Sequence, residues 1–153
     1  MGESITANGL TFSTAGYTIA PHATDSTFTL TLGGTTPTIN TAGVGASISA
    51  ILAGSNGMIK TGTDNLTLSG ANTYTGSTNI QEGTVHLSSG SLAADTTLNL
   101  GNGSNSGKFI LSGTAVVNQT VADLTTTGTG TSNAVVGGNA TVSTLTVNKA
   151  SGN

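Results

Sequence analysis

Hydrophobic and polar residues alternate along most of the chain instead of recurring at helical spacing. Leu66-Thr67-Leu68 is typical: two leucines share one side of the chain, and the threonine between them faces the other side. A period of two indicates strands with one buried face, and threonine suits the exposed face because β-branched side chains pack well on a pleated surface. The chain is therefore predicted to be almost entirely β. The residues predicted to point inward and stack are Leu30, Leu32, Leu66, Leu68, Ile80, Val85, Leu87, Leu98, Leu100, Leu145 and Val147.

The predicted strands are short, and Gly, Asn or Ser closes nearly every one of them. An antiparallel sandwich would need longer strands and larger core residues. A parallel β-solenoid has a narrow interior that accepts Leu, Ile, Val, Ala and Thr, and it turns a corner every few residues. The spacing therefore favours a single solenoid domain over residues 1–153. At about 20 residues per coil, it would have about seven coils and a length of roughly 35 Å.

Residues 44–87 resemble the autotransporter-associated β-strand repeat of bacterial autotransporter passengers and related giant surface proteins. The resemblance is carried by LAGSNG at 52–57, IKTG at 59–62, LTLSGANTYTG at 66–76, TNI at 78–80 and GTVHL at 83–87. Weaker matches flank it at 8–19 and 142–148, and Asp64-Asn65 and Ser77 depart from the family pattern. The resemblance implies a right-handed parallel β-helix outside the bacterial outer membrane. From this resemblance we expect Gly70, Asn72, Tyr74, Gly76 and Gly83 to be corner positions of the repeat.

The composition excludes several partners. Only 6% of residues are charged, the net charge is −3, and the three lysines are the only Lys or Arg residues. So few cations cannot neutralise a row of phosphates, so we expect no nucleic-acid partner. No apolar run is long enough to cross a bilayer, and the first residues lack the features of a signal peptide, so we expect no membrane insertion by this chain. Disorder is disfavoured because 35% of residues are hydrophobic.

Candidate chemical groups are sparse. His22 lies near Asp25 and His86 lies on an outward strand position, but neither has a second histidine or a cysteine at metal-ligand spacing. Stacking would bring Asp64 and Glu82, which are about one coil apart, close together, as in a hydrolase pair. The other acids are scattered singly. We therefore expect no catalytic residue, no metal site, no cofactor and no enzyme activity.

The sequence leaves three roles open besides an enzyme. The first is a structural cell-surface rod segment that associates with itself head-to-tail through exposed solenoid ends. The second is an adhesin module that binds a surface glycan through the loop at 101–107, which reads as a mobile turn. The third is an ice-binding face made of Thr-x-Thr pairs, as at 61–63, 125–131 and 144–146. The first is our hypothesis. The ligand, the organism, the parent protein and the secretion route are left open.

Overall fold

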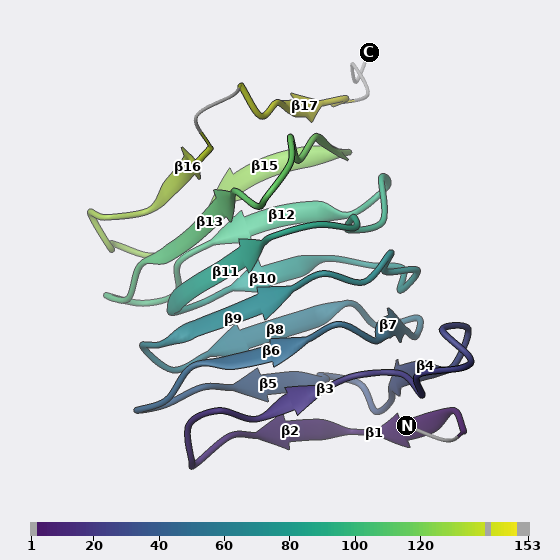
Figure 1. The fold of residues 1–153 in the computed structure, drawn as a ribbon. Coiled ribbons are helices and arrows are strands. Elements are labelled where there is room, and N and C mark those ends of the chain that lie inside the picture. Colours follow the sequence, from purple (N-terminus) through teal and green to yellow (C-terminus); the bar gives the residue numbers. More distant parts are fainter. Residues whose placement is uncertain (1–2, 140–141, 150–153) are drawn as a thin grey trace.

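The chain winds into a stack of coils in which each strand pairs in parallel with the strand one coil away (Figure 1). This computed structural model describes residues 3–139 and 142–149. The strands in these residues are short, two to five residues each, because the chain must turn a corner after each one. All the pairings between them are parallel, which confirms the predicted β-solenoid.

Three faces run along the solenoid. The first face contains two sheets, β1-β4-β7 near the N-terminus and β14-β17 near the C-terminus, whose strands are β1 (Ile5–Ala7), β4 (Thr29–Leu32), β7 (Ile51–Ala53), β14 (Gln119–Val121) and β17 (Leu145–Val147). The second face is a six-stranded sheet of β2 (Gly9–Thr11), β5 (Thr38–Asn40), β8 (Met58–Thr61), β10 (Thr78–Ile80), β12 (Thr97–Leu100) and β15 (Asp123–Thr126). The third face is a six-stranded sheet of β3 (Thr18–Ile19), β6 (Ala46–Ile48), β9 (Asn65–Leu68), β11 (Gly83–Leu87), β13 (Gly107–Leu111) and β16 (Ala134–Gly137).

The coils are unequal in length. In the middle of the chain Ile48 aligns with Leu68, and Leu68 aligns with Leu87, so these coils have about 20 residues. Towards the ends Ile19 aligns with Ile48, and Val121 aligns with Val147, which makes these coils 29 and 26 residues long. Longer loops at the corners account for the difference. The described residues therefore form about six coils, slightly fewer than the seven that a uniform coil predicts.

The interior consists of columns of stacked aliphatic residues. One column holds Ile48, Leu68, Leu87 and Leu111, each at most 2% exposed and each aligned with the next across a strand pair. Most of the residues predicted to point inward are buried in this way, namely Leu30, Leu32, Leu66, Leu68, Ile80, Val85, Leu87, Leu98 and Leu100. The last strand differs. Val147 is 42% exposed and Leu145 is half-buried, because no further strand of the described chain covers β17. Val147 therefore stacks on Val121 as predicted but is not buried in this structure.

Tyr74 is a second correction. The sequence places it at a corner, but it is fully buried on the first face, where residues 72–75 run alongside β7. The Thr73 and Tyr74 amides both donate to the carbonyl oxygen of Leu52. The Tyr74 hydroxyl lies 2.6 Å from the Thr78 hydroxyl, which lies 3.0 Å from the hydroxyl of Thr96. This buried chain of hydroxyl groups satisfies the phenol, so a tyrosine is tolerated in the core.

Asn72 is also buried and is not a solvent-exposed corner. Its side-chain oxygen accepts from the Leu52 amide at 2.9 Å, and its side-chain nitrogen donates to the Ser91 carbonyl at 2.9 Å. Asn72 thereby joins three consecutive coils at a place where regular strand pairing is interrupted. Two coils later Gln119 joins its coil to the preceding one, where its side chain accepts from the Leu92 amide and donates to the Leu92 carbonyl. Side-chain amides thus replace missing backbone bonds on this face.

Gly76 and Gly83 are the two predicted corners that require glycine for its backbone conformation. Their φ angles are +90° and +72°, a region that other residues rarely adopt. At Gly83 a Cβ atom would also lie 2.4 Å from the carbonyl oxygen of Gly62 in the preceding coil. Gly70 has no positive φ, but a Cβ atom there would lie 2.5 Å from the Ala50 carbonyl oxygen. Close stacking of coils at the corners therefore explains the glycines of the repeat.

Candidate functional site

The histidines singled out in the sequence have local structural partners. His22 and Asp25 face each other across an exposed turn, where the Asp25 amide donates to the His22 carbonyl oxygen at 3.1 Å. The Asp25 carboxylate accepts from both the hydroxyl and the amide of Thr27, and these two bonds lower its pKa. His86 points outward from β11, and its Nε2 atom lies 2.6 Å from both the carbonyl oxygen and the hydroxyl of Ser112. His22 Nδ1 likewise lies 2.9 Å from the Thr24 hydroxyl, so each ring contacts a hydroxyl group, but within the described residues neither ring bonds to the carboxylate that would complete a catalytic triad.

The threonine pairs do not gather on one face. Thr29 and Thr31 belong to the β1-β4-β7 sheet, Thr61 and Thr125 belong to the six-stranded sheet of the second face, and Thr146 lies on β17. Along the second face, the outward column that contains Thr125 continues through Asn99, Asn79 and Ile59. An ordered hydroxyl and methyl array needs threonine at the same position in each coil. The columns of this solenoid do not supply such an array.

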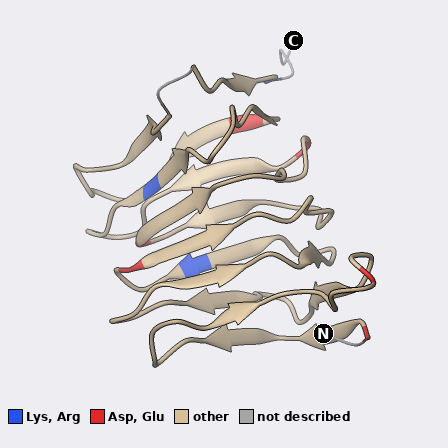
Figure 2. Cartoon of the chain, viewed as in Figure 1, with Lys and Arg blue, Asp and Glu red and all other residues tan. Residues whose placement is uncertain are grey.

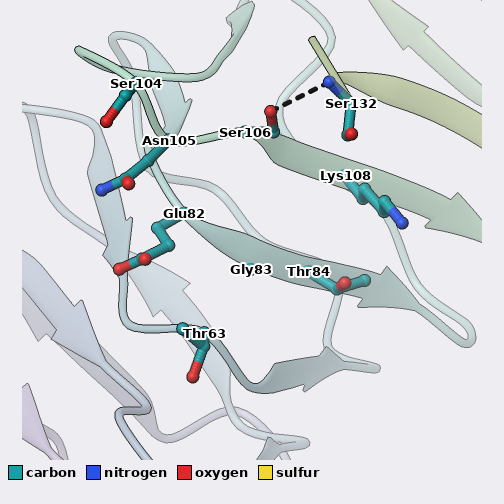
Figure 3. A pocket seen from close by; sticks show the side chains of 9 residues that line it. All are labelled: Thr63, Glu82, Gly83, Thr84, Ser104, Asn105, Ser106, Lys108 and Ser132. Carbon is teal, nitrogen blue, oxygen red and sulfur yellow. Dashed lines mark hydrogen bonds between the residues drawn. The ribbon is translucent and has the colours of Figure 1, made fainter. Parts of the chain in front are cut away.

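The loop at 101–107 forms one wall of a polar pocket on the side of the solenoid (Figure 3). The pocket has a volume of about 380 Å³. It is lined by Thr63, Glu82, Gly83, Thr84, Ser104, Asn105, Ser106, Lys108 and Ser132, which come from four consecutive coils and include no apolar side chain. This is the place in the described structure where the candidate loop, a carboxylate and a lysine come together.

Charged groups are few and separated over the rest of the surface that the structure describes (Figure 2). Lys149 pairs with Asp123 at 2.9 Å, and this bond lowers the pKa of the Asp123 carboxyl. Asp64 and Glu82 occupy adjacent corners, where the Thr84 amide donates to the Asp64 carbonyl oxygen. Their carboxylates make no hydrogen bond to each other. Between residues 3 and 149, leaving out 140–141, no three His, Asp or Glu side chains gather to hold a metal ion.

Lys60 is a buried charged residue that the sequence analysis did not identify. It points inward from β8 and is fully buried, in a column with Ile39, Ile80 and Leu100. Its ammonium donates to the carbonyl oxygens of Thr61 and Gly62 at 2.9 and 2.7 Å. A third bond, 3.1 Å long, reaches the Glu82 carbonyl of the next coil. The alternation Met58-Ile59-Lys60 contains the signal, because the buried Met58 places Lys60 on the inward side.

The cage of carbonyl groups allows a cation inside the solenoid, but burial still disfavours the charge. Burial lowers the pKa of Lys60 from 10.5 to about 8, although the negative charges of Glu82 and Asp64 act in the opposite direction. The three bonds tie the corner after β8 to the corner before β11. Lys60 is therefore a structural residue whose protonation affects stability.

We expect the free energy of unfolding to rise as the pH is raised from about 8 to 10. Below pH 8 both the folded and the unfolded chain carry the Lys60 ammonium, so the penalty for burying it is fully present. Above pH 8 the folded state releases this proton while the unfolded state still holds it, so stability increases with pH. Tyr74, whose pKa is raised by burial, opposes the trend only above about pH 10, where an unfolded tyrosine ionises.

Urea unfolding of the natural chain and of Lys60→Met, measured at several pH values from 7 to 10, checks this prediction. The Met variant keeps an unbranched side chain that is only one atom shorter, and it removes the titrating group. The rise should therefore be present in the natural chain and absent in the variant. Equal pH dependence in the two proteins would mean that Lys60 is not buried as the structure has it.

Both ends of the solenoid expose interior columns. At the N-terminal end Ile5 is 45% exposed, although its column neighbour Leu30 is 2% exposed. An apolar hollow of about 370 Å³ lies there, lined mainly by Ile5, Ala7, Leu10, Ile19 and Leu30. At the other end Val147 is 42% exposed over the fully buried Val121, and Leu124 is 37% exposed over the fully buried Leu98. At both ends, therefore, residues of the interior apolar columns are exposed.

Comparisons with known proteins agree with this architecture. Residues 58–87 match the passenger-associated-transport-repeat family. A curated relative from Brucella suis biovar 1 (strain 1330), named Adhesin BmaC autotransporter, is 39% identical over 105 residues. The match covers 67% of this chain, and the chain spans about 3% of the length of that relative. No solved structure matches the chain at a significant level. The described residues contain no helix with the length and hydropathy needed to cross a membrane.

Proposed function

Because this chain carries a passenger-associated transport repeat of the autotransporter type, we propose that it is a structural segment of a surface-displayed rod. Its role is to extend the rod, and its ends stack head-to-tail on further solenoid coils, including those of a second copy of this chain. The segment acts outside the cell. We assign no catalytic step and no cofactor to this segment.

The exposure of interior apolar columns at the two ends carries this proposal. Ile5 and Leu30 occupy the same column, but only Leu30 has a coil on both sides of it. One further coil against the N-terminal end would cover Ile5 just as β7 covers Leu30. The same holds for Val147 above Val121 at the C-terminal end. Apolar surface of this kind contributes about 25 cal/mol for each Å² that is removed from water.

The backbone supports the same conclusion. The strands at each end have one edge without a partner strand among the described residues, and unpaired edges are templates for another strand. The two ends differ in sequence, so contact between them is heterologous and leaves a free end after each addition. A net charge of −3 on 153 residues adds little repulsion between copies. The association is therefore open and propagates along the solenoid axis.

Sedimentation velocity over a concentration series tests the proposal. The natural chain should sediment faster as concentration rises, whereas Ile5→Glu should stay monomeric because it places a charge on the apolar end. Val116→Glu is the matched control: Val116 is 46% exposed and lies beside Ser88–Gly90 on the side of the solenoid, so this variant should associate like the natural chain. A natural chain that is monomeric at every concentration, or equal inhibition by both substitutions, would contradict stacking through the ends.

Adhesion is the second candidate function. The Brucella relative is named an adhesin, and the polar pocket beside the 101–107 loop gives this chain a surface feature suited to ligand binding. A rod segment and a binding module are compatible roles, because stacking uses the ends and the pocket lies on the side.

A further inference from the structure

The 101–107 loop is held in one conformation by its own bonds and by the next coil. Asn102 and Asn105 exchange two backbone hydrogen bonds of 3.2 and 3.0 Å. The following coil adds a bond from the Ser132 amide to the Ser106 hydroxyl, 3.0 Å long. The Asn133 side chain accepts from the Gly107 amide at 2.8 Å. The wall of the pocket is thus preorganised, which lowers the entropic cost of binding a ligand.

The two charged groups of the pocket are available to a ligand. Neither the Glu82 carboxylate nor the Lys108 ammonium makes a side-chain hydrogen bond or an ion pair within the described part of the chain. Lys108 is exposed and pairs in register with Thr84 across β13 and β11. In Figure 3 the Glu82 side chain lies on the side of Thr63 and Asn105, whereas Lys108 lies on the side of Thr84. The pocket therefore offers an acceptor at one side and a cationic donor at the other.

We propose that this pocket binds an acidic saccharide, a sugar that carries hydroxyl groups and one carboxylate. A carboxylate such as Glu82 accepts hydrogen bonds from neighbouring sugar hydroxyls, and the Asn105 amide and Ser104 hydroxyl can both donate and accept. Lys108 supplies a charge-assisted bond to the sugar carboxylate. A polyphosphate is disfavoured because the pocket has a single cation and an opposing carboxylate. An apolar peptide is disfavoured because no lining residue is apolar.

Binding is expected to be weak, with a Kd of about 1 to 10 mM, because the affinity comes from hydrogen bonds in an open pocket that has no aromatic side chain for the sugar to stack on. This saccharide site rests on the second candidate function, adhesion, and gives that function a location on the molecule. The pocket lies on the side of the solenoid, so a negative binding result would leave the proposed stacking of the ends unaffected.

Amide chemical-shift titrations of the whole chain test the proposal with a matched pair of sugars, methyl glucuronide and methyl glucoside. The two differ in whether carbon 6 carries a carboxylate or a hydroxymethyl group. We expect saturable shifts at Thr84 and residues 104–108, with tighter binding of the glucuronide. Acetate at the same concentration should give no saturable shift there. Failure to saturate by about 50 mM, or equal affinity for both sugars, would overturn the proposal.

Single substitutions distinguish the contribution of Glu82 to binding from that of Lys108. Glu82→Gln should raise the Kd for both sugars about tenfold, because it removes a charged hydrogen-bond acceptor. Lys108→Gln should abolish the preference for the glucuronide and leave glucoside binding unchanged. Asp95→Asn and Lys149→Gln remove equivalent charges outside the pocket and should change neither affinity. Preserved spectra will show that each variant folds. A glucuronide preference that survives Lys108→Gln would refute the assignment.

Discussion

Replacing Leu68 with Asp is expected to lower the free energy of unfolding by about 4 kcal/mol. Leu68 is fully buried between Ile48 and Leu87 in an aliphatic column, so the carboxylate would have no cation and no hydrogen-bond donor. The neighbouring change Thr67→Asp should cost less than about 1 kcal/mol, because Thr67 points outward between Ser47 and His86.

Urea unfolding monitored by circular dichroism measures both variants, and the Thr67 variant is the control for adding one acid to β9. Because Leu68 points inward and Thr67 points outward, the two variants should differ greatly in their loss of unfolding free energy. Equal losses would show that the side chains of β9 do not alternate between the core and the surface, and the column description of the interior would then be incorrect.

Replacing Tyr74 with Ala is expected to lower the free energy of unfolding by about 3 to 5 kcal/mol. The ring is fully buried, and removing it leaves a cavity that the rigid stack of coils cannot close. Tyr74→Phe should cost about 1 kcal/mol, because it removes only the hydroxyl that bonds to Thr78, and Thr78 keeps its partner Thr96.

The same urea titration compares the two Tyr74 variants with the natural chain. A small loss of unfolding free energy for Tyr74→Ala would show that Tyr74 lies at an exposed corner, as the sequence predicts. A loss for Tyr74→Phe as large as that for Tyr74→Ala would mean that the buried hydroxyl chain, and not the aromatic ring, stabilises this part of the core.

Strand alternation predicted most of the core, and the short strands, the frequent corners and the family resemblance together predicted the solenoid fold. The pattern around Leu66-Thr67-Leu68 and Val85-His86-Leu87 gives the correct inward side because both strands are regular and both pair with a coil above and below. The resemblance to an autotransporter passenger repeat is confirmed by the family match at 58–87. Coil length was less predictable, since the long loops in the first and last coils do not change the alternation within the strands.

Two of the errors fall where polar side chains replace regular strand pairing. Asn72 and Tyr74 lie among glycines and threonines that are typical of turns, but their buried hydrogen bonds to Leu52, Ser91 and Thr78 form only after stacking. Lys60 was missed for another reason: it lies on a regularly paired strand, but the carbonyl groups that accept from its ammonium belong to two different coils. The pocket beside residues 101–107 also combines four coils, so only its loop was evident in the sequence.

The central claim is that the ends of this solenoid stack on one another, and negative-stain electron microscopy of the purified chain over a concentration series tests it most directly. We expect unbranched fibres whose axial repeat is about 30 Å, from the six coils of the described chain at roughly 4.8 Å per coil. Separate particles, one chain long at every concentration, would contradict the claim.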